Sequence, residues 1–425
     1  MWDKLFQSLR VKEVRNGLLF VLAMMVVFRI AANIPLPGID LGALQRFFEA
    51  NQLLGVLNLF SDGTIRNFSI VALGVAPYIT ASIVFQLLGM IIPRIEEIQK
   101  DGEAGQRRIN QWTRLLTVPL AIIQSVSLIG LMKQSQFNII PSSNLVYLVA
   151  IVCTVTAGTL FLMWLGELIS EKKVGNGMSL LIAAGILADL PASASQFLSA
   201  FDQAQALTLV LYAAVAVATI LGVVFVTEGQ RNIPIQYARQ VRGQGVALGG
   251  VASSLPLRVN MVGVIPIIFA VSMLLFPNLI AQFVARARSE WLAAAGRWVT
   301  LTLQNQTIYG VLFFLFVVGF TYFYTAVVFH PDRIAENLQK QGGFVPGIRP
   351  GRPTAEYIEY IINRITLGGA AFLGIIAILP LIAQGLTGAT QLALGGTSML
   401  IVVSVVIESV KQIEAQATMR EYDAY

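Results

Sequence analysis

Residues 57–90 have the sequence LNLFSDGTIRNFSIVALGVAPYITASIVFQLLGM, and this stretch decides the fold. It starts as a short amphipathic segment, breaks at the SDG triplet, and then stays apolar for long enough to cross a bilayer. The apolar run is interrupted by Gly74, Pro77, Thr80, Ser82 and Gln86. Each of these residues frees backbone groups or needs a polar partner. At membrane depth such backbone is tolerated only inside protein or along a wet cavity, so the stretch predicts a conduit.

Composition indicates an integral membrane protein. Of 425 residues, 56% are hydrophobic and only 12% are charged, whereas soluble domains carry about 25% charged residues. Apolar runs recur from end to end, so we expect one polytopic bundle rather than several soluble domains. The ten predicted spans are residues 17–34, 68–92, 115–132, 145–166, 177–190, 206–226, 261–284, 307–329, 366–383 and 395–409.

The first, fifth and tenth of these segments differ from ordinary membrane spans. The fifth and tenth are short for an average bilayer, so we expect both inside the bundle rather than against lipid. The first follows several basic residues and resembles a signal peptide. Its apolar run continues to about Ala32, however, and only a weak small-residue site follows. We interpret it as a retained first span.

The distribution of Lys and Arg predicts the orientation. If the first segment enters from the cytoplasm, the inner stretches hold 22 of the 29 basic residues, the outer loops hold six, and Arg29 lies within the first span. Because positive residues mark the cytoplasmic side, both termini are predicted to be cytoplasmic. The even number of spans agrees with this orientation.

The chain is predicted to have two halves of five spans, an N-terminal half over residues 1–190 and a C-terminal half over residues 191–425. An odd number of spans in each half suits an inverted repeat, although no repeat is visible by sequence identity. Two inner loops, residues 228–260 and 330–364, are long and net basic. Such loops suit either attraction to anionic lipid or docking of protein or RNA, and the sequence leaves both open.

The chain lacks the signatures of several enzyme classes. A nucleotide-binding P-loop needs a Gly-Lys pair, which does not occur, and His330 is the only histidine, so a two-histidine metalloprotease motif is excluded. Cys153 is the only cysteine. The spans carry almost no charged residue near the midplane, where coupled transporters bind ions or protons. We predict no catalytic residue, cofactor or metal site, and a multi-span solute transporter is the alternative to a passive conduit.

Several short motifs, in order along the chain, carry a resemblance to one family. They are residues 34–38 (IPLPG), 72–79 (ALGVAPYI), 163–167 (MWLGE), 175–179 (GNGMS), 229–231 (GQR), 259–266 (VNMVGVIP), 344–351 (FVPGIRPG), 395–398 (GGTS) and 411–414 (KQIE). Together they cover the spans and both long loops. The chain resembles the SecY family, the channel-forming subunits of the Sec protein translocon.

The resemblance implies an all-α polytopic membrane protein. Its ten transmembrane helices would form two inverted five-helix halves, arranged as a clamshell with a plug helix at about residues 57–67. The expected function is that of a passive gated pore, which passes unfolded secretory polypeptides across the membrane and releases transmembrane segments sideways into lipid. A motor ATPase or the ribosome would drive transport, so the chain itself is not expected to be an enzyme.

The resemblance also assigns roles to individual residues. The constriction of the pore would be formed by Val75, Ile79, Ile182, Ile268 and Ile401. The plug would include Phe60, Ser61, Asp62, Gly63, Thr64, Ile65, Arg66 and Asn67. The lateral gate would include Thr80, Gln124 and Asn260, and partners would dock on Arg349, Arg231, Arg239 and Arg242. From the residues alone, each of these isoleucines is equally an ordinary lipid-facing or packing side chain, and each gate residue an ordinary interhelical hydrogen-bonding group.

The loop around Arg349 has a feature of its own. Two Pro-Gly pairs bracket this arginine and predict a rigid tip that holds its guanidinium outward. The implied partners are small membrane subunits of the SecE and SecG types, a SecA-type motor ATPase, the ribosome, unfolded preproteins with their signal peptides, and membrane lipid. The implied location is the bacterial plasma membrane.

Overall fold

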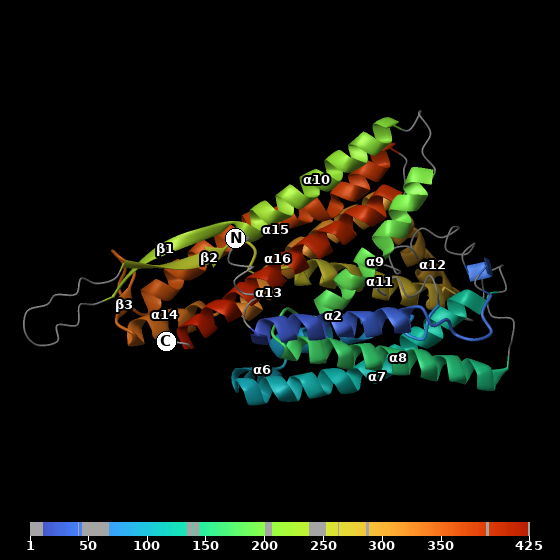
Figure 1. Cartoon of the computed structure of the whole chain (residues 1–425), viewed down its shortest axis with the longest axis horizontal. Helices are drawn as coiled ribbons and strands as arrows, with labels where there is room; N and C mark the ends of the chain where they lie inside the picture. Colours follow the sequence, from blue (N-terminus) through green and yellow to red (C-terminus); the bar gives the residue numbers. More distant parts are fainter. Residues whose placement is uncertain are drawn as a thin grey trace, which may run out of the picture.

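The computed structural model of the chain is mainly helical (Figure 1). The structure describes residues 12–40, 42–44, 68–133, 139, 144–199, 206–237, 252–261, 263–285, 289–387 and 391–423. The predicted plug, residues 57–67, lies outside these ranges.

The helices follow one another along the chain with few long connections. They are α2 (Lys12–Ala32), α5 (Ala76–Ile91), α6 (Pro93–Lys100), α7 (Glu103–Lys133), α8 (Leu145–Glu171), α9 (Gly177–Ser199), α10 (Ala206–Glu228), α11 (Ile265–Val284), α12 (Glu290–Gln304), α13 (Gln306–Val328), α14 (Pro331–Lys340), α15 (Arg352–Thr387) and α16 (Gln391–Asp423). Each of the ten predicted spans coincides with one of these helices, namely α2, α5, α7 to α11, α13, α15 and α16.

Length and composition support a membrane location for many of them. In the described part of the chain, five helical stretches are long and apolar enough to cross a bilayer, and α5 with α6 makes a sixth if a bent pair counts as one span. Shorter apolar helices lie at Gly177–Ala188, Ala213–Glu228 and Ile265–Leu274. These belong to α9, α10 and α11.

The fifth and tenth helices are longer than the predicted segments. Helix α9 has 23 residues and continues through Pro191 to Ser199, whereas the predicted segment stopped before this proline because proline removes a helical hydrogen bond. Helix α16 has 33 residues and continues to Asp423. Hydropathy marks only the part of a helix that lies in hydrocarbon, so the polar end of α16 was not included.

The second span is broken at its start, as the opening stretch predicted, and it also bends at its other end, which the sequence did not predict. Residues 68–75 form a series of turns, and α5 begins only at Ala76, with Pro77 in its first turn. Proline is compatible with this position because the first turn has no intrahelical partner for its missing N–H. At the other end the chain bends by 109° between α5 and α6, where Pro93 starts the second helix.

The two long inner loops form a structure that the sequence did not predict. Strands β1 (Gln230–Tyr237), β2 (Ala252–Arg258) and β3 (Gly343–Phe344) make an antiparallel sheet in the order β2-β1-β3. The sheet packs with α14 and the start of α15 around a small apolar core that includes Ile233, Leu338 and Ile358. We call the three strands, α14 and residues 345–365 the sheet platform. Figure 1 shows it projecting from one end of the helical bundle.

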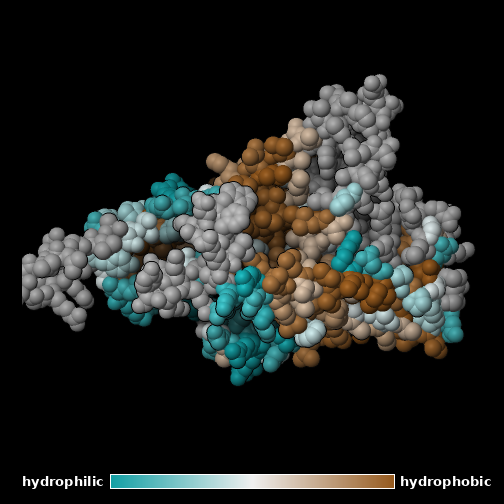
Figure 2. Space-filling model, viewed as in Figure 1, coloured by the Kyte–Doolittle hydropathy of each residue, from teal (hydrophilic) through white to brown (hydrophobic). Residues whose placement is uncertain are grey.

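The main core runs through the bundle and joins its two halves. It includes buried residues of α2, α8 and α9 from the first half and of α11, α13 and α16 from the second. Figure 2 shows hydrophilic surface over the sheet platform and over the region of α6, with hydrophobic surface across the helices beyond them. This banding is typical of a membrane protein with a water-exposed base.

Candidate functional site

The five residues predicted to form the constriction lie together in the main core. Val75 and Ile79 come from the start of α5, Ile182 from α9, Ile268 from α11 and Ile401 from α16. Their exposed fractions are 0%, 6%, 1%, 4% and 2% in that order. Four helices from both halves therefore contribute branched aliphatic side chains to one buried cluster. A neck lined in this way excludes water and blocks ions.

The segment that leads into α5 is held by its backbone. The N–H of Leu36 donates to the carbonyl of Phe68, and the N–H of Ile70 donates to the carbonyl of Ile34, both at 3.0 Å. Phe68 is buried and has a φ of +38°, an uncommon conformation for a residue with a side chain. We call residues 68–75 the α5 root. It directly follows the predicted plug.

Helix α8 closes the other side of the α5 root. A Cβ atom added to Gly158 would lie 2.0 Å from the carbonyl oxygen of Ile70. Contact this close is possible only for glycine, because real Cβ atoms do not approach backbone oxygen so nearly. The α5 root is therefore fixed between residues 34–36 on one side and α8 on the other.

The predicted lateral gate lies where α11 packs against α5 and α7. Gln124 on α7 is buried. The hydroxyl of Thr80 donates to the carbonyl of Ala76, one turn earlier in its own helix, at 3.0 Å. Asn260 accepts from the N–H of Gly263 at 3.0 Å and donates to the carbonyl of Gly263 at 3.1 Å. These hydrogen bonds of Thr80 and Asn260 are each made within one segment of the chain.

A cavity of about 520 Å³ opens between helices of the two halves, nearer the sheet platform. Its lining comes from α5, α6 and α7 on one side and from α13 and α14 on the other. Ser82 and Gln86 line it, and the Gln86 amide donates to the Ser82 hydroxyl at 3.1 Å. The Gln86 side-chain oxygen is buried and has no protein partner. Such a group favours water in the cavity.

None of the three predicted gate residues lines this cavity. The sequence did offer a signal for it, since Ser82 and Gln86 were among the polar interruptions of the second span. Spaced by four residues, they share one face of α5.

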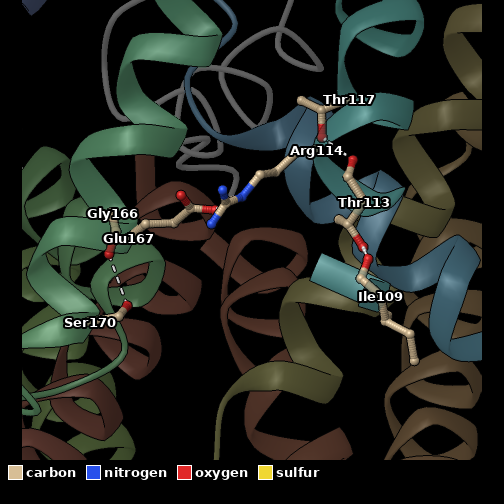
Figure 3. A network of polar contacts seen from close by, with 7 residues as sticks. All are labelled: Ile109, Thr113, Arg114, Thr117, Gly166, Glu167 and Ser170. Atoms are coloured by element: carbon tan, nitrogen blue, oxygen red, sulfur yellow. Dashed lines mark hydrogen bonds and ion pairs between the residues drawn. The ribbon is translucent and has the colours of Figure 1, made fainter. Parts of the chain in front are cut away.

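A polar network links α7 and α8 (Figure 3). The Nε of Arg114 donates to Glu167 at 2.6 Å, and the two side chains come from helices that pack against each other. On α8, the hydroxyl of Ser170 donates to the carbonyl of Gly166 at 2.8 Å and accepts from the N–H of Gly177 at 2.9 Å. Ser170 thereby joins the end of α8 to the start of α9. No pattern in the sequence predicted that Arg114 pairs with Glu167.

Contacts between the ends of several helices gather on one side of the bundle, and one of them joins the two halves. The Nζ of Lys411 on α16 lies 2.8 Å from Glu228 at the end of α10. The amide of Gln416, further along α16, donates to the carbonyl of Lys172 in the α8–α9 connection at 3.4 Å. A Cβ atom on Gly17 of α2 would lie 3.4 Å from Val174 in that same connection. The two described ends of the chain therefore lie on the same side of the bundle.

Two of the four predicted docking residues, Arg231 and Arg349, belong to the sheet platform. Arg231 is exposed on β1, and Arg349 lies in the connection between β3 and α15. Gly347 and Gly351 have φ values of +82° and +98°, and the Thr354 hydroxyl donates to the carbonyl of Arg349 at 2.9 Å. The connection is thus a fixed turn, as its two Pro-Gly pairs predicted.

Arg349 is exposed on this turn, and the turn itself is held against the platform core through Val345 and Ile348. Arg239 and Arg242 lie outside the described residues.

These features define a class of protein. Apolar helices of spanning length, an aliphatic core shared by helices of both halves, and a partly polar cavity between helices are those of a multi-pass helical membrane protein. A family model described as SecY matches residues 69–410. The chain belongs to the SecY family.

Relatives agree over their full length. The chain is 41% identical over 445 residues to the protein translocase subunit SecY of Mycobacterium tuberculosis H37Rv, with all of both chains covered. It is 43% identical over 438 residues to the protein translocase subunit SecY of Streptomyces galbus, covering 99% of this chain and 98% of the relative. It is 42% identical over 448 residues to the subunit of Mycobacterium leprae, again with all of both chains covered.

Solved structures share the fold. One, described as the structure of a protein conducting channel, has a TM-score of 0.64 at 17% identity and covers 93% of this chain and 91% of its own. Another, described as Sec61 in the canine ribosome-channel complex from the endoplasmic reticulum, has a TM-score of 0.59 at 16% identity, with the same shares covered.

Proposed function

We propose that this chain is the protein-conducting channel subunit of a Sec-type translocase. Unfolded secretory polypeptides would pass through the neck, and transmembrane segments would leave sideways through the seam. The observation that carries the proposal is that all five predicted neck residues, which come from the start of α5 and from α9, α11 and α16, are buried in the main core that joins the two halves. The names of the relatives and of the structural neighbours support the same function. They do not favour a solute transporter.

The chemistry of the neck suits a substrate of any sequence. A ring of branched aliphatic side chains offers no hydrogen bonds, so it does not hold one polypeptide more than another. In the resting state it dewets, and an empty neck blocks ions. In this proposal Val75, Ile79, Ile182, Ile268 and Ile401 form that ring. The plug at about residues 57–67 closes the outer half of the pore.

The lateral gate would lie along the seam between α5 and α7 on one side and α11 and α13 on the other. Hydrogen bonds between membrane helices contribute only about 0.6 kcal/mol on average. A seam closed by a few of them can part when an apolar signal helix offers a competing surface. The polar cavity beside Ser82 and Gln86 supports a seam that is incompletely packed at one end.

Energy and partners would come from outside the chain. No nucleotide-binding motif occurs in the sequence, so a SecA-type motor or the translating ribosome would drive transport, and the chain would not be an enzyme. The sheet platform carries Arg231 and Arg349 and is the proposed docking surface for both partners. The canine ribosome-channel complex among the structural neighbours supports ribosome docking. SecE-type and SecG-type subunits would complete the complex.

The proposed location is the bacterial plasma membrane, with both termini in the cytoplasm. The contacts of α16 and α2 with the α8–α9 connection support a common side for the two ends. The excess of basic residues on that side supports its cytoplasmic orientation. The two proposed halves, residues 1–190 and 191–425, would meet at the neck, although α9 continues past residue 190 to Ser199.

The decisive experiment measures ion conductance in planar bilayers. Ile401→Asn and Ile268→Asn each place a polar amide in the buried cluster, so the neck should wet, resting ion leak should rise and signal-sequence selection should loosen. Val406→Asn is the matched control, because Val406 is on α16 like Ile401 but is exposed on the outside of the chain. Unchanged conductance in both neck variants would reject the ring assignment. Saturable uptake of a small solute by the purified chain would instead favour a transporter.

A further inference from the structure

Helix α12 is a short helix that the span prediction did not include. It lies between α11 and α13, at the end of the bundle opposite the sheet platform (Figure 1). With 15 residues it is too short to cross a bilayer. The distribution of basic residues assigns its loop to the outer side of the membrane.

One face of α12 is fixed to α11. Ala293, Gly296 and Leu303 are its buried residues. A Cβ atom on Gly296 would lie 2.4 Å from the backbone nitrogen of Ala285 and 2.6 Å from the carbonyl oxygen of Ala281. The backbones of the two helices therefore touch at this glycine, and the rotation of α12 about its axis is determined.

The remaining surface of α12 is divided into two stripes. Glu290 and Arg297 lie seven residues apart and form a polar stripe. Trp291 and Trp298 recur at the same interval on another face, with exposed fractions of 72% and 68%. A helix with paired exposed tryptophans beside a charged stripe is typical of helices that lie in the plane of a membrane interface.

An apolar cavity of about 250 Å³ opens beneath this face. Three helices line it, and Thr302 supplies the only polar side chain among the lining residues of the described chain. The lining residues are Met273, Leu274 and Pro277 of α11, Trp298, Val299, Thr302 and Leu303 of α12, and Leu312 and Phe316 of α13.

The cavity is continuous with the surface that faces hydrocarbon. Met273 of α11 lines the cavity and is also one of the large apolar side chains exposed on the outside of the chain. In a bilayer such side chains contact lipid tails. A hydrocarbon chain can thus pass from the membrane into the cavity without meeting a charged group of the lining.

We propose that α12 lies in the headgroup region of the outer leaflet and that the cavity between α11, α12 and α13 holds one acyl chain of a membrane phospholipid. The tryptophans would sit at headgroup level, where their amphipathic rings are stable. Glu290 and Arg297 would face water and headgroups. The inference does not depend on what the neck conducts.

The test uses the full chain with its co-purified subunits in nanodiscs that contain a phospholipid with a photoreactive diazirine on its acyl chain. Adducts are mapped by mass spectrometry after irradiation. We expect adducts on cavity residues of α11, α12 and α13. Val299→Trp and Leu312→Trp fill the cavity from two different helices. Each should lower the adduct yield there roughly tenfold, the equivalent of about two buried methylene groups.

Leu315→Trp is the control, because it adds similar bulk on the exposed face of α13 outside the cavity. It should leave the yield in the cavity unchanged. Two filling variants are used so that misfolding of one does not decide the result. An unchanged yield in both would overturn the proposal. So would absence of cavity adducts in the parent, or cross-links showing that a second copy or a small subunit covers Trp298.

Discussion

Arg114 on α7 and Glu167 on α8 form an ion pair across two neighbouring helices, with Nε and Oε1 2.6 Å apart. Their side chains are 48% and 24% exposed, so water screens the pair only in part. The pair lies where the third and fourth predicted spans approach the side of the sheet platform. It therefore fixes how the ends of two membrane helices lie relative to each other, close to the α8–α9 connection that α16 and α2 also contact.

We expect this pair to couple the two helices measurably. In a double-mutant cycle with Arg114→Ala and Glu167→Ala, the coupling energy should be about 0.5–1 kcal/mol, because partly screened pairs reach the upper part of the range for surface salt bridges. The measurement is unfolding of the purified chain in detergent. The control is the pair Arg107–Glu103, whose atoms lie 3.7 Å apart on side chains that are 81% and 93% exposed. Its coupling should be near zero, and equal values for both pairs would contradict the prediction.

The α5 root gives a second prediction. Gly158→Ala would bring a methyl group to within 2.0 Å of the Ile70 carbonyl oxygen, so the root must shift. We expect lower thermal stability and a higher resting ion leak, because the root follows the predicted plug directly and carries Val75, the first residue of the proposed neck. Gly130→Ala on α7 is the control, since its added Cβ meets nothing within 4 Å. Alanine there should stabilise slightly, by up to about 1 kcal/mol. An unchanged leak in Gly158→Ala would show that the seal does not depend on the root.

Substitutions at Asn260 and Gly263 can show whether Asn260 makes a direct gating contact or only supports the turn before α11. The Asn260 side chain donates to and accepts from the backbone of Gly263, which has a φ of +68°. Gly263→Ala should strain this turn by about 1–2 kcal/mol. If Asn260 acts by shaping the start of α11, we expect Asn260→Ala and Gly263→Ala to change signal-sequence selection alike. A change in Asn260→Ala alone, measured by export of preproteins with weakened signals, would instead support a direct gating contact.

Hydropathy predicted the helical part of the fold well because the bilayer sets the length of a span. All ten predicted segments coincide with helices. The break at the start of the second span was predictable from Pro77, because proline favours the first turn of a helix, whereas the bend at Pro93 was not predicted. At the end of α16 the residues become polar while the helix continues. Hydropathy there predicts where the helix leaves the membrane, but it does not predict where the helix ends.

The sheet platform was missed although a signal for it was present. Ile233, Ile235 and Tyr237 alternate with more polar residues in β1, which is the period of a strand with one buried face. Its partners Leu255 and Leu257 alternate in the same way in β2. The stretch was treated as a loop because it joins two spans. What no local pattern could supply is the contact of these strands with α14 and α15, about a hundred residues later.

The candidate site was likewise predictable only in part. Family motifs identified the five aliphatic residues that share the main core, but the ion pair of Arg114 with Glu167 joins residues 53 positions apart. Such a pair depends on how α7 and α8 pack. The sequence offered one clue to this pair. Glu167 follows the fourth predicted span and Arg114 precedes the third, and both positions are predicted on the inner side of the membrane.

The exposed position of Arg349 on a fixed turn leads to a docking prediction. Arg349→Glu should leave membrane insertion and thermal stability of the channel intact and abolish motor-driven export, because it reverses the charge on a turn already fixed by Gly347, Gly351 and Thr354. Export is measured in proteoliposomes with a purified SecA-type motor. Arg352→Glu is the control, since Arg352 is an exposed arginine close by in the chain that already pairs with Glu356 at 3.1 Å. Normal export by Arg349→Glu would remove this arginine from the docking surface. Loss of stability would show instead that the substitution disturbs the turn itself.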